Sequence, residues 1–258
     1  MKFILPKIKD PRFIYLAEKA KENGFTVSEY DDSLPTESAV YVFPLNLREE
    51  ETLEILSKIP ADSFVFLGRG SDSVKSLARQ KNIHLTCLLE QESYLLKNAA
   101  HTAEGALAEI IAHVPRRLDD LCFLIYGYGN CGKFIARLLW ICGAEVWIWS
   151  RERGQAQALR DGFNIYPAPD KGLGMFDAVI NTVPDPIFAP DFLSTMQKDS
   201  FFFQIASGYS GIAPEEMKTM GIRFIPLHGL PGKYRPASEA DAIWNEVKRC
   251  RAIQRRIL

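Results

Sequence analysis

A glycine-rich turn between two apolar segments constrains the fold of this 258-residue chain more than any other feature. Residues 127–132 read Gly-Tyr-Gly-Asn-Cys-Gly, and they follow an apolar run at 121–126. A helical pattern that ends at Gly143 comes next, and a second apolar run follows at 145–149. This order of strand, turn, helix and strand is typical of the unit that binds dinucleotides. It predicts that the helix presents its free N–H groups to a diphosphate.

Each glycine of the turn has a distinct expected role. Gly127 would make the tight turn, Gly129 would let a diphosphate approach the backbone, and Gly132 would let the helix pack on its strand. The alternative is a glycine turn that binds nothing, which the flanking strands disfavour. We interpret the cysteine of the turn as a small residue beside the phosphates rather than as a reactive thiolate. The other predicted cofactor contacts in the turn are Tyr128, Asn130 and Cys131.

The residues after the second apolar run indicate which dinucleotide would bind. A site for NAD usually has Asp or Glu at this position, where the carboxylate holds the ribose hydroxyls. This chain has Ser150 and Arg151 there, with Arg153 close by. A guanidinium pairs well with phosphate oxygens, so these residues favour NADP, with NAD as the alternative. A solvated loop with no contact to the ligand is the structural alternative for the arginines.

Composition narrows the class of protein. The chain is 47% hydrophobic and 24% charged, as in ordinary globular proteins, and its net charge of −1 argues against a nucleic-acid partner. Its apolar segments are too short to span a bilayer and its N-terminus has no secretory pattern, so we expect a cytoplasmic protein with no membrane partner. Five cysteines without paired spacing predict neither a disulfide framework nor a metal site.

The spacing of apolar runs predicts an α/β fold with two domains. Strand and helix patterns alternate over residues 1–96, which predicts a flavodoxin-like parallel sheet that carries the substrate or catalytic groups. Residues 97–235 begin with a long helical pattern and continue as a Rossmann NAD(P)-binding domain. Residues 236–258 read as one helix, which we expect to join the first domain.

Ligands of open parallel sheets bind at the carboxyl ends of the strands, so the segments that follow strands hold the candidate site residues. The segment after the fourth strand of the second domain is expected to approach the nicotinamide half of the cofactor. The segment after the fifth strand forms a tight turn at the same edge. The cofactor-binding residues predicted in these two segments are Asn181, Thr182, Val183, Pro184 and Ala206, and Ser207 is predicted to contact substrate.

Residues 228–236 form the loop expected after the sixth strand, and they bring a histidine and two cations together. An imidazole such as that of His228 suits acid–base catalysis, whereas a histidine bonded to a loop carbonyl is the structural alternative. Lys233 is the second predicted catalytic residue, because it could bind a carboxylate, and ordinary loop charge is its structural alternative. Further substrate contacts are predicted at Arg12, Arg69, Thr102 and Arg235. Several cations in a chain of near-zero net charge indicate a small anionic substrate, such as a dicarboxylate.

Several of these motifs, taken in order, resemble the A subunit of dipicolinate synthase from spore-forming bacteria, and the resemblance spans most of the chain. The pieces that carry it are Asp10-Pro11-Arg12, Asn98 with Thr102-Ala103-Glu104-Gly105, the turn at 127–132, Ser150-Arg151, Val-Ile-Asn-Thr-Val-Pro at 179–184, Ile-Ala-Ser at 205–207 and Gly-Leu-Pro-Gly-Lys at 229–233. The 2-hydroxyacid dehydrogenases differ, because they have an arginine after the fifth strand and residues 206–211 contain none.

The resemblance implies an oxidoreductase that converts a cyclic dihydrodipicolinate-type intermediate to pyridine-2,6-dicarboxylate during sporulation, with NAD(P)+ as hydride acceptor. It also implies a protein partner, the flavoprotein-like B subunit. The chain departs from the family at residues 204–211, where Gln-Ile-Ala-Ser-Gly-Tyr-Ser-Gly replaces Asp-Leu-Ala-Ser-Lys-Pro-Gly-Gly. It also has Pro6-Lys7 where the family has a glycine pair.

Two other interpretations stay open at this point. One is a divergent dehydrogenase for another small anionic substrate, and the other is a redox-inactive nucleotide-binding sensor or partner subunit. The sequence also leaves self-association into a homo-oligomer open.

Overall fold

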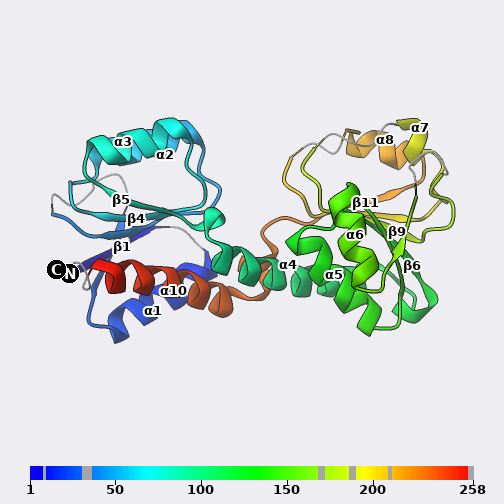
Figure 1. The fold of residues 1–258 in the computed structure, drawn as a ribbon, viewed down its shortest axis with the longest axis horizontal. Helices are drawn as coiled ribbons and strands as arrows, with labels where there is room; N and C mark the ends of the chain where they lie inside the picture. Colours follow the sequence, from blue (N-terminus) through cyan, green and yellow to red (C-terminus); the bar gives the residue numbers. More distant parts are fainter. Residues whose placement is uncertain (8–9, 31–36, 168–171, 186–189, 209–210, 255–258) are drawn as a thin grey trace. The chain divides into compact units, whose positions relative to one another are not determined.

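The computed structural model describes residues 1–7, 10–30, 37–167, 172–185, 190–208 and 211–254 (Figure 1). Contacts between Cα atoms divide the chain into two units, Met1–Asn98 with Arg235–Leu258, and Ala99–Tyr234. Each unit holds one parallel sheet. The domain boundaries that the sequence predicts, 1–96 with 236–258 and 97–235, stay a prediction, and the last four residues of the expected helix lie outside the described chain.

The first unit has a five-stranded parallel sheet in the order β2-β1-β3-β4-β5. This is the strand order of flavodoxin-like folds, so the predicted fold class of this unit is confirmed. Within β1, Phe3 pairs with Val27 of β2 on one side and with Val40 of β3 on the other. The strands are β1 (Lys2–Pro6), β2 (Thr26–Tyr30), β3 (Val40–Val42), β4 (Phe64–Leu67) and β5 (His84–Cys87).

Helices cover both faces of this first sheet (Figure 1). Helix α1 (Pro11–Glu22) and helix α10 (Pro236–Gln254) pack together on one face, where Leu16, Phe3 and Trp244 share a buried cluster. On the other face lie α2 (Glu49–Lys58) and α3 (Asp72–Gln80), followed by the short 3-10 helix η1 (Leu88–Glu90).

Helix α4 (Glu92–His113) is continuous, with residues 92–98 in the first unit and 99–113 in the second. The 3-10 helix η2 (Leu118–Asp120) follows it and leads into the second sheet. Among the described helices, none combines the length and the apolar character that crossing a bilayer requires.

The second unit has a six-stranded parallel sheet in the order β11-β10-β9-β6-β7-β8. Numbered within the unit, this is the order 6-5-4-1-2-3 of dinucleotide-binding Rossmann folds, so the second predicted fold class is also confirmed. The strands are β6 (Cys122–Tyr126), β7 (Glu145–Trp149), β8 (Asn164–Ile165), β9 (Ala178–Asn181), β10 (Phe201–Gln204) and β11 (Arg223–Pro226).

Two buried clusters lie on opposite faces of this sheet. The second half of α4 packs on one face with α5 (Asn130–Ile141), α6 (Glu152–Arg160) and α9 (Leu230–Tyr234). The other face is covered by α7 (Pro190–Leu193) and α8 (Pro214–Thr219), whose Leu193 and Met217 are fully buried (Figure 1).

One element differs from the sequence interpretation, which treated 228–236 as a loop. Residues 230–234 form helix α9, and Pro231 lies in its first turn, where a missing N–H costs nothing. The helix lies close against α4, because a Cβ atom at Gly105 would come within 2.9 Å of the Leu230 Cβ. A five-residue helix has too few positions to show a helical period in the sequence.

Candidate functional site

A cavity of about 330 Å³ lies where strands β6, β7 and β9 end. Strand β6 pairs with β7 on one side and with β9 on the other, so this is the point at which the strand order reverses. Open α/β sheets bind their ligands at such a switch point. The cavity is lined by Gly127, Tyr128, Gly129, Trp149, Ser150, Arg151, Thr182, Val183, Pro184 and Asp185.

The geometry of the turn accounts for all three glycines. Gly127 has φ +101°, and a Cβ atom there would come within 2.5 Å of the Thr182 Oγ1. A Cβ atom at Gly132 would come within 2.2 Å of the Gly127 carbonyl oxygen. At Gly129, which precedes α5 with φ −81°, a Cβ atom would meet no heavy atom within 4 Å. The space at Gly129 therefore admits a ligand against the backbone, whereas the other two positions are closed by protein.

The segment after β9 is fixed by hydrogen bonds. The backbone N–H and the hydroxyl of Thr182 both donate to the Tyr126 carbonyl oxygen, each at 2.9 Å. The side-chain carbonyl of Asn181 accepts from the N–H of Val183 at 3.0 Å. The Asn181 amide donates in turn to the Gln204 Oε1 at 2.9 Å. The residues that line this side of the cavity are thus held by the ends of β6 and β10.

Two residues predicted to contact the cofactor are buried instead of lining the cavity. Asn181 is fully buried, and Ala206 is 9% exposed. Gln204 links them, because its Nε2 donates to the Ala206 carbonyl oxygen at 2.9 Å while its Oε1 accepts from Asn181. An aspartate at position 204 could accept from Asn181 but could not also donate to Ala206. A direct contact of either residue with the cofactor stays a prediction.

At the end of β7 the structure brings the predicted residues Ser150 and Arg151 together with Asp185. The sequence analysis did not predict Asp185 as a site residue. The Arg151 Nη2 lies 3.2 Å from the Asp185 Oδ2, with the two side chains 87% and 53% exposed. Ser150 lies under the start of α6, since a Cβ atom at Gly154 would come within 2.1 Å of the Ser150 Oγ. Arg153 is exposed on α6 and lies outside the set that lines the cavity.

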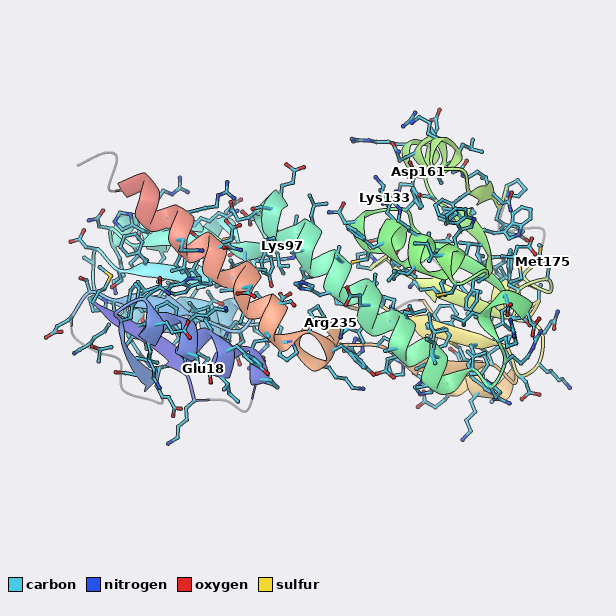
Figure 2. All side chains as sticks on the ribbon, turned by 90° about the horizontal axis from the view of Figure 1, so that it is seen from below. Glu18, Lys97, Lys133, Asp161, Met175 and Arg235 are labelled. Atoms are coloured by element: carbon cyan, nitrogen blue, oxygen red, sulfur yellow. The ribbon has the colours of Figure 1, made fainter. Side chains whose placement is uncertain are left out.

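Aromatic residues form two walls of the cavity. Trp149 stacks on Tyr126 with ring centroids 3.9 Å apart and an interplanar angle of 19°. Tyr128 donates its hydroxyl to the Asp161 Oδ2 at 2.8 Å, and the Lys133 Nζ lies 5.8 Å from the centroid of its ring. Lys133 and Asp161 are labelled in the second unit in Figure 2. Burial and the hydrogen bond with Asp161 raise the pKa of Tyr128, and the same bond lowers the pKa of Asp161. Tyr128 is therefore a neutral, fixed wall at neutral pH.

Cys131 and Thr102 lie together, on α5 and on α4. Burial raises the pKa of the Cys131 thiol, and a hydrogen bond with Thr102 opposes that shift. Desolvation thus disfavours the thiolate form of Cys131. Thr102 is 8% exposed. Its predicted substrate contact, and the cofactor contacts of Cys131 and of the exposed Asn130, stay predictions.

Lys233 lies in an ion pair with a carboxylate of its own unit. Its ammonium donates to Glu109, a residue of α4 that is 8% exposed. The Tyr234 hydroxyl donates to the same Glu109 oxygen at 2.8 Å, and the His113 Nδ1 lies 3.6 Å from the other oxygen. The hydrogen bond from Lys233 is the main influence that lowers the pKa of Glu109, and it raises the pKa of Lys233. The side chain of Lys233 is still 60% exposed.

The remaining predicted residues lie in both units. His228 and Ser207 are exposed in the second unit, after β11 and β10. In the first unit, Arg69 and Arg235 are exposed, whereas Arg12 is largely buried at the start of α1. The convergence of these residues on one substrate stays a prediction.

The fold and the cavity at the switch point define a class of two-unit α/β proteins in which the second unit has the Rossmann strand order. The chain is similar in fold to a D-isomer specific 2-hydroxyacid dehydrogenase from Lactobacillus delbrueckii ssp. bulgaricus, solved in its NAD-complexed form, with a TM-score of 0.55, 11% identity and coverage of 99% of this chain and 97% of that one. Within this class the chain is similar to the A subunit of dipicolinate synthase. The Bacillus subtilis (strain 168) protein is 25% identical over 194 residues, which are 74% of this chain and 65% of that relative.

The structure of the A subunit of dipicolinate synthase from Bacillus halodurans agrees with this chain at a TM-score of 0.80 and 20% identity, over 96% of this chain and 97% of that one. No protein-family model matches the chain. The resemblance to the A subunit of dipicolinate synthase that the motifs indicate is therefore confirmed. The sequence match spans less than two thirds of the curated relative's length.

Proposed function

We propose that this protein is an NAD(P)-dependent oxidoreductase that works like the A subunit of dipicolinate synthase. In this proposal it oxidises a dihydrodipicolinate-type cyclic dicarboxylate to pyridine-2,6-dicarboxylate during spore formation. The observation that carries the proposal is the glycine turn, which leaves open space at Gly129 where the Rossmann strand order reverses. The similarity to the A subunit of dipicolinate synthase supports the choice of reaction.

The residues of the turn fit the diphosphate of a dinucleotide. The free N–H groups at the start of α5 suit phosphate oxygens, and the helix dipole favours their negative charge. When bound, the nicotinamide supplies the hydride acceptor, while the substrate ring loses one hydride and one proton and becomes aromatic. The chain itself would therefore mainly bind and orient the two reactants.

We assign NADP as the preferred cofactor. The two residues directly after β7, where an NAD site usually has a carboxylate, are Ser150 and Arg151. Arg151 is highly exposed beside the cavity, so its guanidinium can reach a ribose 2′-phosphate. Arg153, in the first turn of α6, adds a second positive charge nearby.

For the substrate we propose that carboxylates bind to Arg12, Arg69 and Arg235, with Thr102 and Ser207 as further contacts. The guanidinium of Arg12 is held in place, because its Nε and Nη2 donate to the Asp10 carboxylate at 3.0 and 2.6 Å. Asp10 also caps α1 by accepting from the Arg12 N–H. A guanidinium fixed in this way has lost much of its side-chain entropy before a ligand binds.

The proposed catalytic residues are His228 and Lys233. His228 would take the proton that leaves the ring. Glu109 positions Lys233 through the ion pair and leaves more than half of its side chain exposed, so the ammonium can also pair with a substrate carboxylate. By analogy with the relative, which is one subunit of a synthase, we also propose a protein partner, a flavoprotein-like B subunit.

The test follows absorbance at the wavelength of reduced nicotinamide. The purified chain is mixed with NADP+ and dihydrodipicolinate, with and without a B-type partner. Reduction of NADP+ that depends on the chain would support the proposal. Tight binding of NADP+ with no turnover in either mixture would contradict it and favour a nucleotide sensor. Turnover with another cyclic acid only would indicate a different substrate.

A further inference from the structure

An ion pair joins the two segments that flank the mouth of the cavity. Arg151 directly follows β7, Asp185 follows β9, and both line the cavity. The Nη2 of the arginine lies 3.2 Å from the Oδ2 of the aspartate. The guanidinium that we assign to a 2′-phosphate therefore has a carboxylate of its own chain as its partner.

The position of Asp185 depends on the hydrogen bonds at the end of β9. Thr182 is bound to the Tyr126 carbonyl oxygen through two donors, and Val183 is bound to the side chain of Asn181. Pro184 comes next, and its ring fixes its own φ. Few free backbone rotations therefore separate the anchored residues 182–183 from Asp185. The backbone that carries Asp185 is thus anchored beside the cavity independently of the pairing with Arg151.

A carboxylate at this place lowers the affinity for one nicotinamide dinucleotide and raises the affinity for the other. A 2′-phosphate carries nearly two negative charges and must compete with Asp185 for one guanidinium. The free 2′-hydroxyl of NAD+ is a donor that a carboxylate can accept. Both effects lower the affinity for NADP+ relative to that for NAD+.

We propose that Asp185 sets the cofactor preference of this site, acting as the counter-ion of Arg151 until a 2′-phosphate replaces it. The inference rests on the proposed function, because it takes the cavity to be a nucleotide site. It adds a residue outside the usual acidic position after β7 that tunes the choice between NADP+ and NAD+.

Isothermal titration calorimetry with NADP+ and with NAD+ tests this on the full chain and on three variants, Asp185→Asn, Arg151→Gln and the double variant. Asp185→Asn keeps the size of the side chain and removes its charge. We expect it to raise the ratio of NADP+ to NAD+ affinity roughly two- to fivefold, the upper part of the range for exposed charge pairs. In the Arg151→Gln background the same change should have a smaller effect, since no guanidinium is left to release. Raising the salt concentration should shrink the effect in both backgrounds.

Asp199→Asn is the matched control. Asp199 also pairs with an exposed arginine, Arg223, at 3.0 Å, and it lines a different cavity of the same unit. Its variant should leave the affinity ratio unchanged. If NADP+ and NAD+ bind but Asp185→Asn changes their ratio by less than twofold, the inference is overturned and the proposed function stands. If neither nucleotide binds the unmodified chain, both are overturned.

Discussion

Adding one methyl group at each of two glycines in the turn should separate cofactor binding from stability. Gly129→Ala introduces a Cβ atom into open space at φ −81°, where an alanine has no backbone strain. Gly132→Ala introduces one 2.2 Å from the Gly127 carbonyl oxygen, which is more than 1 Å inside normal contact. The same chemical change therefore meets an empty space in one case and a protein atom in the other.

The expected magnitudes follow from these distances. For Gly132→Ala, the start of α5 must move away from the turn, and such overpacking typically costs about 1–3 kcal/mol. For Gly129→Ala, alanine is a poorer N-cap residue than glycine but restricts the unfolded chain, so the two effects largely cancel. Its methyl group would instead keep a diphosphate from the N–H groups of α5. Losing one charge-assisted hydrogen bond costs about 1.5–3 kcal/mol of binding free energy, which raises the dissociation constant roughly 10- to 150-fold.

Calorimetric titration with NADP+ and thermal unfolding are measured on each variant. We expect Gly129→Ala to lose affinity while the midpoint of thermal unfolding changes by less than about 3 °C, and Gly132→Ala to lower that midpoint by more. Gly174→Ala is the control, because a Cβ atom there would lie 3.4 Å from the Thr195 carbonyl oxygen, an ordinary contact away from the cavity. If Gly129→Ala binds NADP+ within twofold of the unmodified chain, the reasoning about the turn is refuted.

Three further predictions concern the charged residues around the site. Arg151→Asp should shift the preference from NADP+ to NAD+, and equal affinities before and after, measured by calorimetry, would remove the cofactor assignment. Lys233→Ala should raise the KM for the dicarboxylate severalfold while the dissociation constant of NADP+ stays within twofold, and an unchanged KM in steady-state kinetics would discard its substrate role. Glu109→Gln should lower the midpoint of thermal unfolding at pH 7 by a few degrees. Because the folded pKa of Glu109 is lowered below 4.5, its contribution is present above that pH and is lost as the pH falls through the folded pKa. The difference between the two proteins should therefore vanish in acid, and a difference that persists unchanged there would contradict this account.

The strands and the glycine turn could be predicted because their signals are local. A parallel strand covered on both faces needs apolar residues at every position, and 201–203, three consecutive phenylalanines, show this clearly. The expected strand at 145–149 has the bounds that β7 has in the structure. The need for glycine at 127 and 132 also follows from the local backbone, since Gly127 has φ +101° and a Cβ atom at Gly132 would meet the Gly127 carbonyl oxygen.

Contacts between distant residues could not be predicted in this way. Lys233 and Glu109 are 124 residues apart, and nothing in the helical pattern of α4 shows that Glu109 faces α9 rather than solvent. Trp149 and Asp185 line the cavity, yet one reads as the end of an apolar strand and the other as an ordinary loop acid. Charge and periodicity assign a residue to an element, but only the packing of the elements shows which side chains meet.

The segment after β10 shows how a departure from the family pattern can leave a neighbouring motif intact. Gln204 stands where the relatives are expected to have aspartate, and its amide accepts from Asn181 and donates to Ala206 at the same time. Asn181 is thereby still held in the orientation that fixes Val183. The hydrogen bonds that hold this side of the cavity are thus made by glutamine instead of aspartate. Gly208 stands where the relatives are expected to have lysine. It follows that a change after Ala206 need not disturb this side of the cavity, because Asn181 and Gln204 hold it through hydrogen bonds among residues 181–206.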